Sequence, residues 1–390
     1  MPADRSFRFL HAAGVGPGRR LRCLPSLSDD DRATAASASI DVWDAVVETA
    51  TVEEAKFLLV TDSPVDEWVT SPPGRDALRT GLSRLEAAGI AVVWVLDRGD
   101  RVLEGDDASR IRFVGRSSDV VDLPADTGGA GVRIEVGDAS EGRDGRVVIR
   151  CDRRDRRRDD LLDVEPPAGV AYVGLKAVPG LGVTGRQTDG VCVRHVGPCL
   201  PIEEHDRGAA GATLVEVDRK GRADARHLAL SPVRRERFLL RADPQDTPDD
   251  LAVKAFEAVS SIAASPCERL WLVRWVVVTS DRSASLHTDE IRRRFHNDLA
   301  AIDPPSAAVA VTHDLSVVGG DASLETVPHV DAAMLRREIG TAVTSRRVAR
   351  MPAGDSAAGD VAAAVASADD AFVTAAASSR VAAALAAVAK

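Results

Sequence analysis

Three short apolar runs mark the first hundred residues of the chain. Residues 7–12 alternate between apolar and polar and then meet the glycines of 14–18, as in a strand that ends in a loop. Residues 56–61 and 90–96 are continuous apolar runs, which is typical of parallel strands buried on both faces. Each of the three runs is therefore predicted to be a strand.

The stretches between these runs carry apolar residues at helical spacing. The first is residues 29–50, with Ser28 placed to cap it, and the second is residues 75–88, which end at Gly89. The order strand, helix, strand, helix, strand is typical of a parallel α/β layer. We therefore expect an α/β fold whose functional side chains lie on the loops that follow the strands.

The second half of the chain contains further strands and then an α+β pattern. Residues 171–175 and 208–218 are predicted strands of the first domain. Trp271 and Trp275 are four residues apart, so a strand places them on one face, where we interpret both as core residues. The α+β pattern consists of predicted strands at 234–243, 270–279 and 307–313 and predicted helices at 249–264 and 287–302.

The length of 390 residues exceeds what a single core usually supports, so we expect more than one domain. We place the first domain at 1–232 and a small α+β capping-like domain at 233–320. The remainder, 321–390, is a helical, alanine-rich segment with a linker at 351–358. The sequence leaves the oligomeric state open, with a dimer among the options.

Composition excludes several classes of protein. No apolar run reaches the ~18–20 residues of a membrane span, and the N-terminus lacks a signal pattern, so we expect a cytoplasmic protein with no membrane contact. A net charge of −10 argues against a protein that coats nucleic acid without specificity. No C-x-x-C pair is present, and we interpret all cysteines as free thiols: Cys23, Cys151, Cys192, Cys199 and Cys267.

The loops that follow the predicted strands are residues 13–20, 61–68 and 97–103. A binuclear centre for phosphoester hydrolysis needs two cations ~3.5–4 Å apart, held by a bridging carboxylate, imidazoles and an amide oxygen. The chain has no histidine between His11 and His195. These loops therefore lack the imidazoles that such a centre would use.

The order of these segments resembles the SbcD-like DNA-repair exonucleases of the calcineurin-like metallophosphoesterase superfamily. That family begins with F-R-F-x-H-A-A-D-x-H, and residues 7–13 (FRFLHAA) match it up to the aspartate and histidine ligands, which are Gly14 and Gly16 here. The second motif of the family, G-D-x-x-D, keeps the bridging Asp62. The glycine and the second aspartate of that motif are not kept, unless Asp66, one residue after the expected position, takes the place of the second aspartate.

The later motifs of the family are also degenerate. Where the family has G-N-H-D, the amide ligand becomes Arg98 and the catalytic histidine becomes Gly99, while the supporting Asp100 is kept. Where the family ends in G-H-x-H after a strand, both histidines are replaced, by Ala177 and Pro179. The resemblance thus keeps the strands and loses most of the ligands.

The resemblance implies a metallophosphoesterase-type layered α/β/α fold, a β-sandwich flanked by helices, with a small capping domain and a helical tail. Residues 208–218 (GAAGATLVEVD) resemble a characteristic strand of the family. In the family, helices after the capping domain engage an SMC-like ATPase that works on DNA, so the resemblance implies DNA and such an ATPase as partners. A tail that docks on its own domain fits the pattern of 321–390 equally well.

The missing ligands argue against the activity of the family. A lone Asp62 carboxylate cannot hold two dehydrated divalent cations against solvent. Arg98 would also place a fixed positive charge where a cation should bind. We therefore expect a catalytically inactive pseudo-phosphoesterase without a cofactor, retained for binding nucleic acid or an SMC-like ATPase.

Two alternatives stay open. The first is an active metal-dependent phosphodiesterase or nuclease that uses Asp62, Asp66 and Asp100 as an all-carboxylate site for Mg²⁺ or Mn²⁺. The second is a structural interaction protein unrelated to DNA, which predicts no salt-dependent retention on DNA.

Most of these residues also have a purely structural interpretation. Asp62 and Asp100 suit loop caps or partners of arginine, and His11 suits a buried, hydrogen-bonded core position. The glycines of 14–18 suit a simple turn rather than a phosphate-binding loop, because Pro17 removes an amide donor and no Lys-Ser/Thr pair follows.

Two basic features of the chain are interpreted in the same way. His195 and His205 fall in a segment that we interpret as loop-rich, and they are too isolated to predict a site. The arginines of 150–158 alternate with aspartates, which favours a solvated, salt-bridged loop over a phosphate contact.

Overall fold

The computed structural model contains two compact units, of which the first consists of residues 1–277 and 283–317. The second consists of 278–282 and 318–390, and only the ends of two strands are described there. The predicted helix at 287–302 and the alanine-rich segment lie outside the described residues, which are 6–61, 71–95, 109–115, 120–124, 131–136, 147–152, 170–175, 184–188, 191–243, 246–279 and 309–319.

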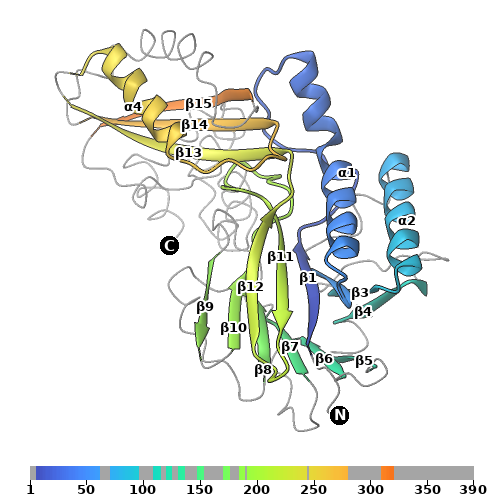
Figure 1. Ribbon diagram of the computed structural model, residues 1–390. Coiled ribbons are helices and arrows are strands. Elements are labelled where there is room, and N and C mark those ends of the chain that lie inside the picture. The colour runs from blue at the N-terminus through green and yellow to red at the C-terminus, as the bar shows by residue number, and fades with distance from the viewer. Residues whose placement is uncertain are drawn as a thin grey trace, which may run out of the picture. The chain divides into compact units, whose positions relative to one another are not determined.

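The first sheet of six strands contains the parallel layer that the sequence predicts (Figure 1). Parallel pairing joins β1 to β2, β2 to β3 and β3 to β4, and β11 and β12 add antiparallel on the other side of β1. Its strands are β1 (Phe7–Ala13), β2 (Phe57–Thr61), β3 (Ala91–Val95), β4 (Ile111–Val114), β11 (Gly211–Val217) and β12 (Ala223–Ala229).

Two helices pack on the outer face of this first sheet through a common apolar cluster. Helix α1 (Asp29–Val52) begins at the predicted cap, where the Ser28 side chain accepts a hydrogen bond from the Asp31 amide. Helix α2 (Pro72–Ala87) begins three residues earlier than predicted, because Ser71 caps the Gly74 amide and proline suits the first helical turn.

The second sheet also has six strands, in the order β5-β6-β7-β8-β10-β9. It packs against the inner face of the first sheet, where Phe9 stacks on Phe57 at 4.7 Å and meets Tyr172 edge-on at 5.4 Å between ring centroids. The two sheets therefore form a β-sandwich. The strands are β5 (Val120–Leu123), β6 (Val132–Val136), β7 (Val147–Asp152), β8 (Val170–Leu175), β9 (Thr184–Thr188) and β10 (Val191–His195).

The third sheet has three strands, in the order β13-β14-β15, and helix α4 packs against it. Trp271 and Trp275 are both buried in its core, which confirms their predicted role, and Trp275 stacks on Phe238 at 4.8 Å. The elements are β13 (Val233–Ala242), α4 (Pro248–Ser260), β14 (Leu270–Thr279) and β15 (Val309–Gly319).

Two predicted boundaries in this third sheet are wrong. Helix α4 ends at Ser260 rather than Ala264, where the Ile262 amide donates to the Val259 carbonyl three residues back and so tightens the last turn. Strand β15 extends to Gly319, beyond the predicted end at 313.

The architecture is an α/β fold with mixed sheets, as the sequence predicts. All five cysteines are free thiols, which confirms their interpretation. Within the part of the chain that the structure describes, no helix has both the length and the apolar character needed to cross a membrane.

Candidate functional site

The candidate site lies at the carboxyl edge of the parallel strands, where loops of α/β proteins usually carry function. Ala13 at the end of β1 pairs with Thr61 at the end of β2, so the two strands end side by side. The Gly14 amide donates to the Thr61 carbonyl at 2.9 Å, with Gly14 in the left-handed region at φ +64°. On the other side, the Cys199 amide donates to the Ala13 carbonyl at 2.7 Å.

The glycine-rich loop after β1 is packed into the protein. Gly14, Val15, Gly16 and Pro17 are all buried. A side chain at Gly74 of α2 would put its Cβ 2.3 Å from the Pro17 carbonyl oxygen, so the helix and the loop touch through their backbones. The loop is therefore a closed turn, as predicted, and Gly14 and Gly16 bring no side chain to the edge of the sheet.

His11 lies directly before this loop and joins the two sheets of the sandwich. Its Nδ1 lies 2.9 Å from the Tyr172 hydroxyl of β8, and its Nε2 lies 3.0 Å from the Thr61 hydroxyl of β2. Burial lowers the pKa of His11 to about 3, so the ring is neutral at physiological pH. This confirms the prediction of a buried, hydrogen-bonded core histidine.

The neighbouring Gly174 leaves the space that the His11 ring occupies. A Cβ at Gly174 would lie 2.6 Å from His11 Cε1 and 3.2 Å from Tyr172 Cε1. Glycine inside a strand often marks such a close approach, and this was the one signal in the sequence that pointed to the contact. Sequence reasoning missed Tyr172, Thr61 and Gly174 as the surroundings of His11.

Both ring nitrogens of His11 are used in these hydrogen bonds, so the ring has no lone pair left for a metal ion. Burial also raises the pKa of the Tyr172 hydroxyl, which keeps it protonated. The arrangement is thus a neutral hydrogen-bonded link between two sheets rather than an acid–base pair.

The described part of the chain contains few of the predicted ligand positions. Among the residues that the structure describes, no group of three or more histidine, cysteine, aspartate or glutamate side chains is arranged to hold a metal ion. The positions that lie outside the described residues are Asp62, Asp66, Arg98, Gly99, Asp100, Ala177 and Pro179.

The two isolated histidines occupy different surroundings. His195 lies on β10 and is buried, so its assignment to a loop-rich segment is wrong: β10 pairs with both β8 and β9 there. His205 does lie in a loop, with its Nε2 4.0 Å from the carboxylate of Asp206.

The loop that contains His205 is held by a buried arginine, which sequence reasoning missed. Arg235 of β13 donates from Nε to the Pro201 carbonyl at 3.0 Å and from Nη2 to the Arg22 carbonyl. Its guanidinium is almost fully buried and is balanced by Asp206, whose pKa is raised by burial. These hydrogen bonds tie β13 to the segment after β10 and to Arg22.

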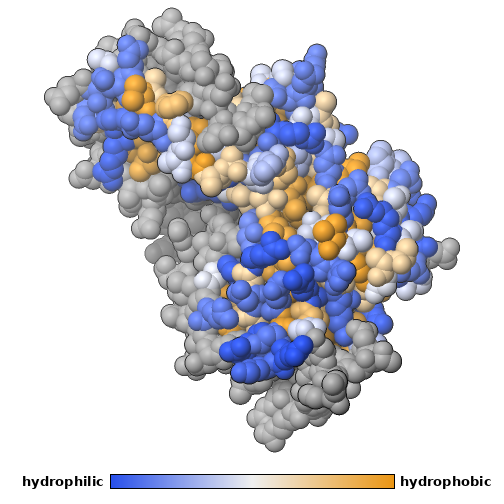
Figure 2. Space-filling view, viewed as in Figure 1, coloured by the Kyte–Doolittle hydropathy of each residue, from blue (hydrophilic) through white to orange (hydrophobic). Residues whose placement is uncertain are grey.

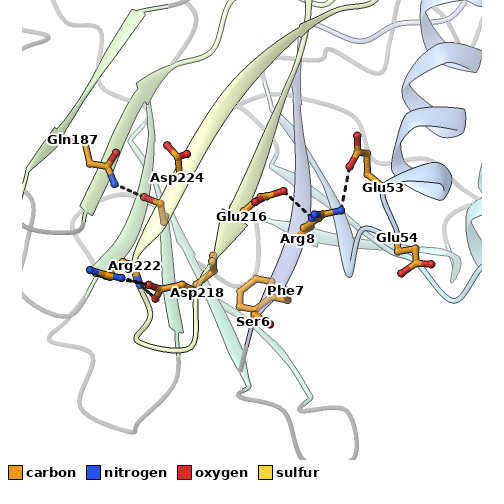
Figure 3. Close-up of a pocket in the computed structure, with 12 residues that line it drawn as sticks. Ser6, Phe7, Arg8, Glu53, Glu54, Gln187, Glu216, Asp218, Arg222 and Asp224 are labelled. Atoms are coloured by element: carbon orange, nitrogen blue, oxygen red, sulfur yellow. Dashed lines mark hydrogen bonds and ion pairs between the residues drawn. The ribbon is translucent and has the colours of Figure 1, made fainter. Parts of the chain in front are cut away.

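A separate open pocket of about 1000 Å³ lies at the amino end of β1 (Figure 3). Arg8 binds both Glu53 and Glu216 there, at 3.3 Å and 2.8 Å, and Arg222 binds Asp218 at 2.7 Å. Hydrophilic residues predominate over this part of the surface (Figure 2). Five carboxylates and two arginines line the pocket, so it carries a net negative charge even though Arg8 and Arg222 pair with three of the carboxylates.

Comparison with known proteins adds no assignment. No family model matches the sequence, and no curated protein is significantly similar to it.

Proposed function

We propose that this protein is a degenerate relative of the SbcD-like metallophosphoesterases that has lost the binuclear metal centre. In this proposal the scaffold is retained to bind nucleic acid or an SMC-like ATPase. The observation that carries the proposal is the closed turn at Gly14. Where the family has the metal ligands of its first motif, this chain has a buried turn, and the Gly14 amide of that turn donates to the Thr61 carbonyl.

The chemistry of the β1 edge supports the loss of metal binding. The family needs a carboxylate and an imidazole at Gly14 and Gly16, and neither position has a side chain. His11 is the nearest imidazole on β1, and both of its nitrogens are engaged with Tyr172 and Thr61. Two hard divalent cations in a dry site need several anionic oxygens, which this edge does not provide among the described residues.

The architecture supports the retained scaffold. A sandwich of two mixed sheets, with antiparallel β11 and β12 beside the parallel strands, is compatible with the family resemblance. The α+β unit of β13, α4, β14 and β15 follows at the place in the chain where the capping domain is expected. Such a scaffold offers surfaces for binding even without a metal centre.

The decisive experiment combines metal analysis with a nuclease assay on the purified full chain. We expect no stoichiometric Mn²⁺, Mg²⁺, Fe or Zn²⁺, and no hydrolysis of linear duplex DNA in the presence of Mn²⁺. Asp62→Ala, with Asp62→Asn as the matched control, should then change nothing. Stoichiometric metal together with hydrolysis that Asp62→Ala abolishes would overturn the proposal in favour of the carboxylate site at Asp62, Asp66 and Asp100.

A second measurement separates the binding roles. Fluorescence anisotropy with labelled DNA at 50 and 200 mM salt should show an affinity that falls steeply with salt, because phosphate contacts release counterions. A protein that acts only through the ATPase would show no DNA binding and would instead co-purify with that subunit. Failure of both would favour a structural role unrelated to DNA.

A further inference from the structure

A row of polar side chains crosses the inner face of the first sheet at the level of His11. The strand register places His11 of β1 opposite Thr213 of β11, and Thr213 opposite His227 of β12. The alternate residues Val215 and Ala225 belong to the core between the two sheets, so all members of the row face the second sheet.

Thr213 and His227 each have a buried polar atom that lacks a hydrogen-bond partner. Thr213 is completely buried, and no described residue lies within bonding distance of its Oγ1. On His227, the atom is Nδ1, which is buried and has no partner among the described residues. Most buried polar atoms in folded proteins have a partner, and an ordered water is one that supplies it where no side chain does.

The hydrogen bond on the other side of the His227 ring fixes its tautomer. Nε2 lies 2.8 Å from the Ala209 carbonyl oxygen, which can only accept, so Nε2 carries the proton. Burial lowers the pKa of His227, and the ring is therefore neutral. Nδ1 is consequently a pure acceptor that needs a donor.

The distance between the two groups suits one bridging molecule. Directly opposite residues on antiparallel strands have Cβ atoms about 4.5–5.5 Å apart, which brings Thr213 Oγ1 and His227 Nδ1 near each other. They are not within direct bonding distance, since neither atom has a partner. A molecule with one donor for Nδ1 and a second polar contact to the hydroxyl fills such a gap.

We propose that a single buried water molecule bridges Thr213 Oγ1 and His227 Nδ1. It donates to Nδ1 and forms its second hydrogen bond with the Thr213 hydroxyl. A cation fits less well, because one imidazole lone pair and one hydroxyl are too few ligands. The Arg194 guanidinium, which donates to the Ala225 carbonyl and lowers the pKa of His227, adds positive charge. This water site is independent of the proposed function.

The direct test is a high-resolution crystal structure of the full chain. We expect one density peak within hydrogen-bonding distance of both Thr213 Oγ1 and His227 Nδ1. Empty space at that position, or a peak with anomalous signal from a metal, would overturn the proposal.

Urea unfolding of two variants gives an independent test. Thr213→Val keeps the shape of the side chain and removes the hydroxyl, so it should leave the water with one partner and raise the unfolding equilibrium constant roughly tenfold. Thr213→Ser keeps the hydroxyl and should retain most of that stability. If Thr213→Val is as stable as the wild type or more stable, its hydroxyl has no partner and the proposal is wrong. If Thr213→Val does not fold, the crystal structure still decides.

Discussion

Replacing Gly174 by alanine tests the link between the two sheets of the sandwich. The added Cβ would lie 2.6 Å from His11 Cε1, a separation that real Cβ atoms essentially never show, and 3.1 Å from His11 Nδ1, which is tighter than most real Cβ contacts. The ring cannot simply move aside, because it is fully buried and bonded at both nitrogens, to Tyr172 and Thr61. Alanine at 174 must therefore displace a side chain that the core holds in place.

The expected cost follows from two contributions. Overpacking a core by one methyl group costs about 1–3 kcal/mol. Loss of one or two hydrogen bonds of His11 adds about 0.5–1.5 kcal/mol for each. Alanine recovers about 0.5–1 kcal/mol because glycine loses more backbone entropy on folding. Gly174→Ala should therefore lower the free energy of unfolding by about 2–4 kcal/mol.

A double-mutant cycle with His11→Ala isolates the contact. His11→Ala is itself destabilising, but it opens the space that the Cβ needs, so Gly174→Ala should cost almost nothing in that background. Urea unfolding of the four proteins, followed by tryptophan fluorescence and circular dichroism, should give a coupling energy of about 2–4 kcal/mol, the whole cost of Gly174→Ala in the wild type. Equal costs in both backgrounds would refute the reasoning, since the His11 ring would then not be what excludes a side chain at 174.

Three further predictions concern ionisable groups. Because burial lowers the pKa of His11 to about 3, the unfolded chain binds a proton there below about pH 6.5 and the folded chain does not. His11 should therefore make stability fall by up to about 1.4 kcal/mol per pH unit as pH drops from 6.5 toward 3, and His11→Gln should remove this slope in urea titrations. Arg235→Ala should cost about 3–6 kcal/mol, because it removes two charge-assisted hydrogen bonds, to the Pro201 and Arg22 carbonyls, at about 1.5–3 kcal/mol each, whereas a loss under 1 kcal/mol would contradict that role. Glu53→Gln should cost less than about 1 kcal/mol, because its ion pairs with Arg8 and Arg226 are partly exposed; a larger loss in thermal unfolding would show that the pocket at the amino end of β1 is structural.

The local elements could be predicted because their causes are local. The apolar run that becomes β2 reflects burial of both its faces, and Ser28 marks the start of α1 through its own hydrogen bond. Strand β1 was found from its alternation, although the structure buries both of its faces from Phe9 to Ala13. Boundaries that depend on distant groups were predicted less well. Strand β15, which lies beside β14 in the third sheet, runs on to Gly319, beyond the predicted end at 313.

The candidate site likewise combines features that the sequence sets with features that only the packing of distant segments sets. The absence of ligand side chains at Gly14 and Gly16 is a property of the sequence, and so is the burial of His11 on an alternating strand. The partners of His11 are not, because Thr61 and Tyr172 lie 50 and 161 residues away and meet it only when the strands are in register and the sheets are packed. The pairing of Thr213 with His227 likewise depends on the register of β11 and β12.

The sequence by itself therefore determined eight of the fifteen described strands, the helices α1, α2 and α4, and the absence of side chains at Gly14 and Gly16, since each depends on neighbouring residues or on the identity of one residue. It did not indicate β4, β5, β6, β7, β9, β10 or β12. Only the tertiary structure decided that the turn at Gly14 is closed by Thr61 and that His11 is neutral and fully engaged. The physical reason is that hydrogen bonding and burial between distant segments depend on register and packing, which no local pattern specifies.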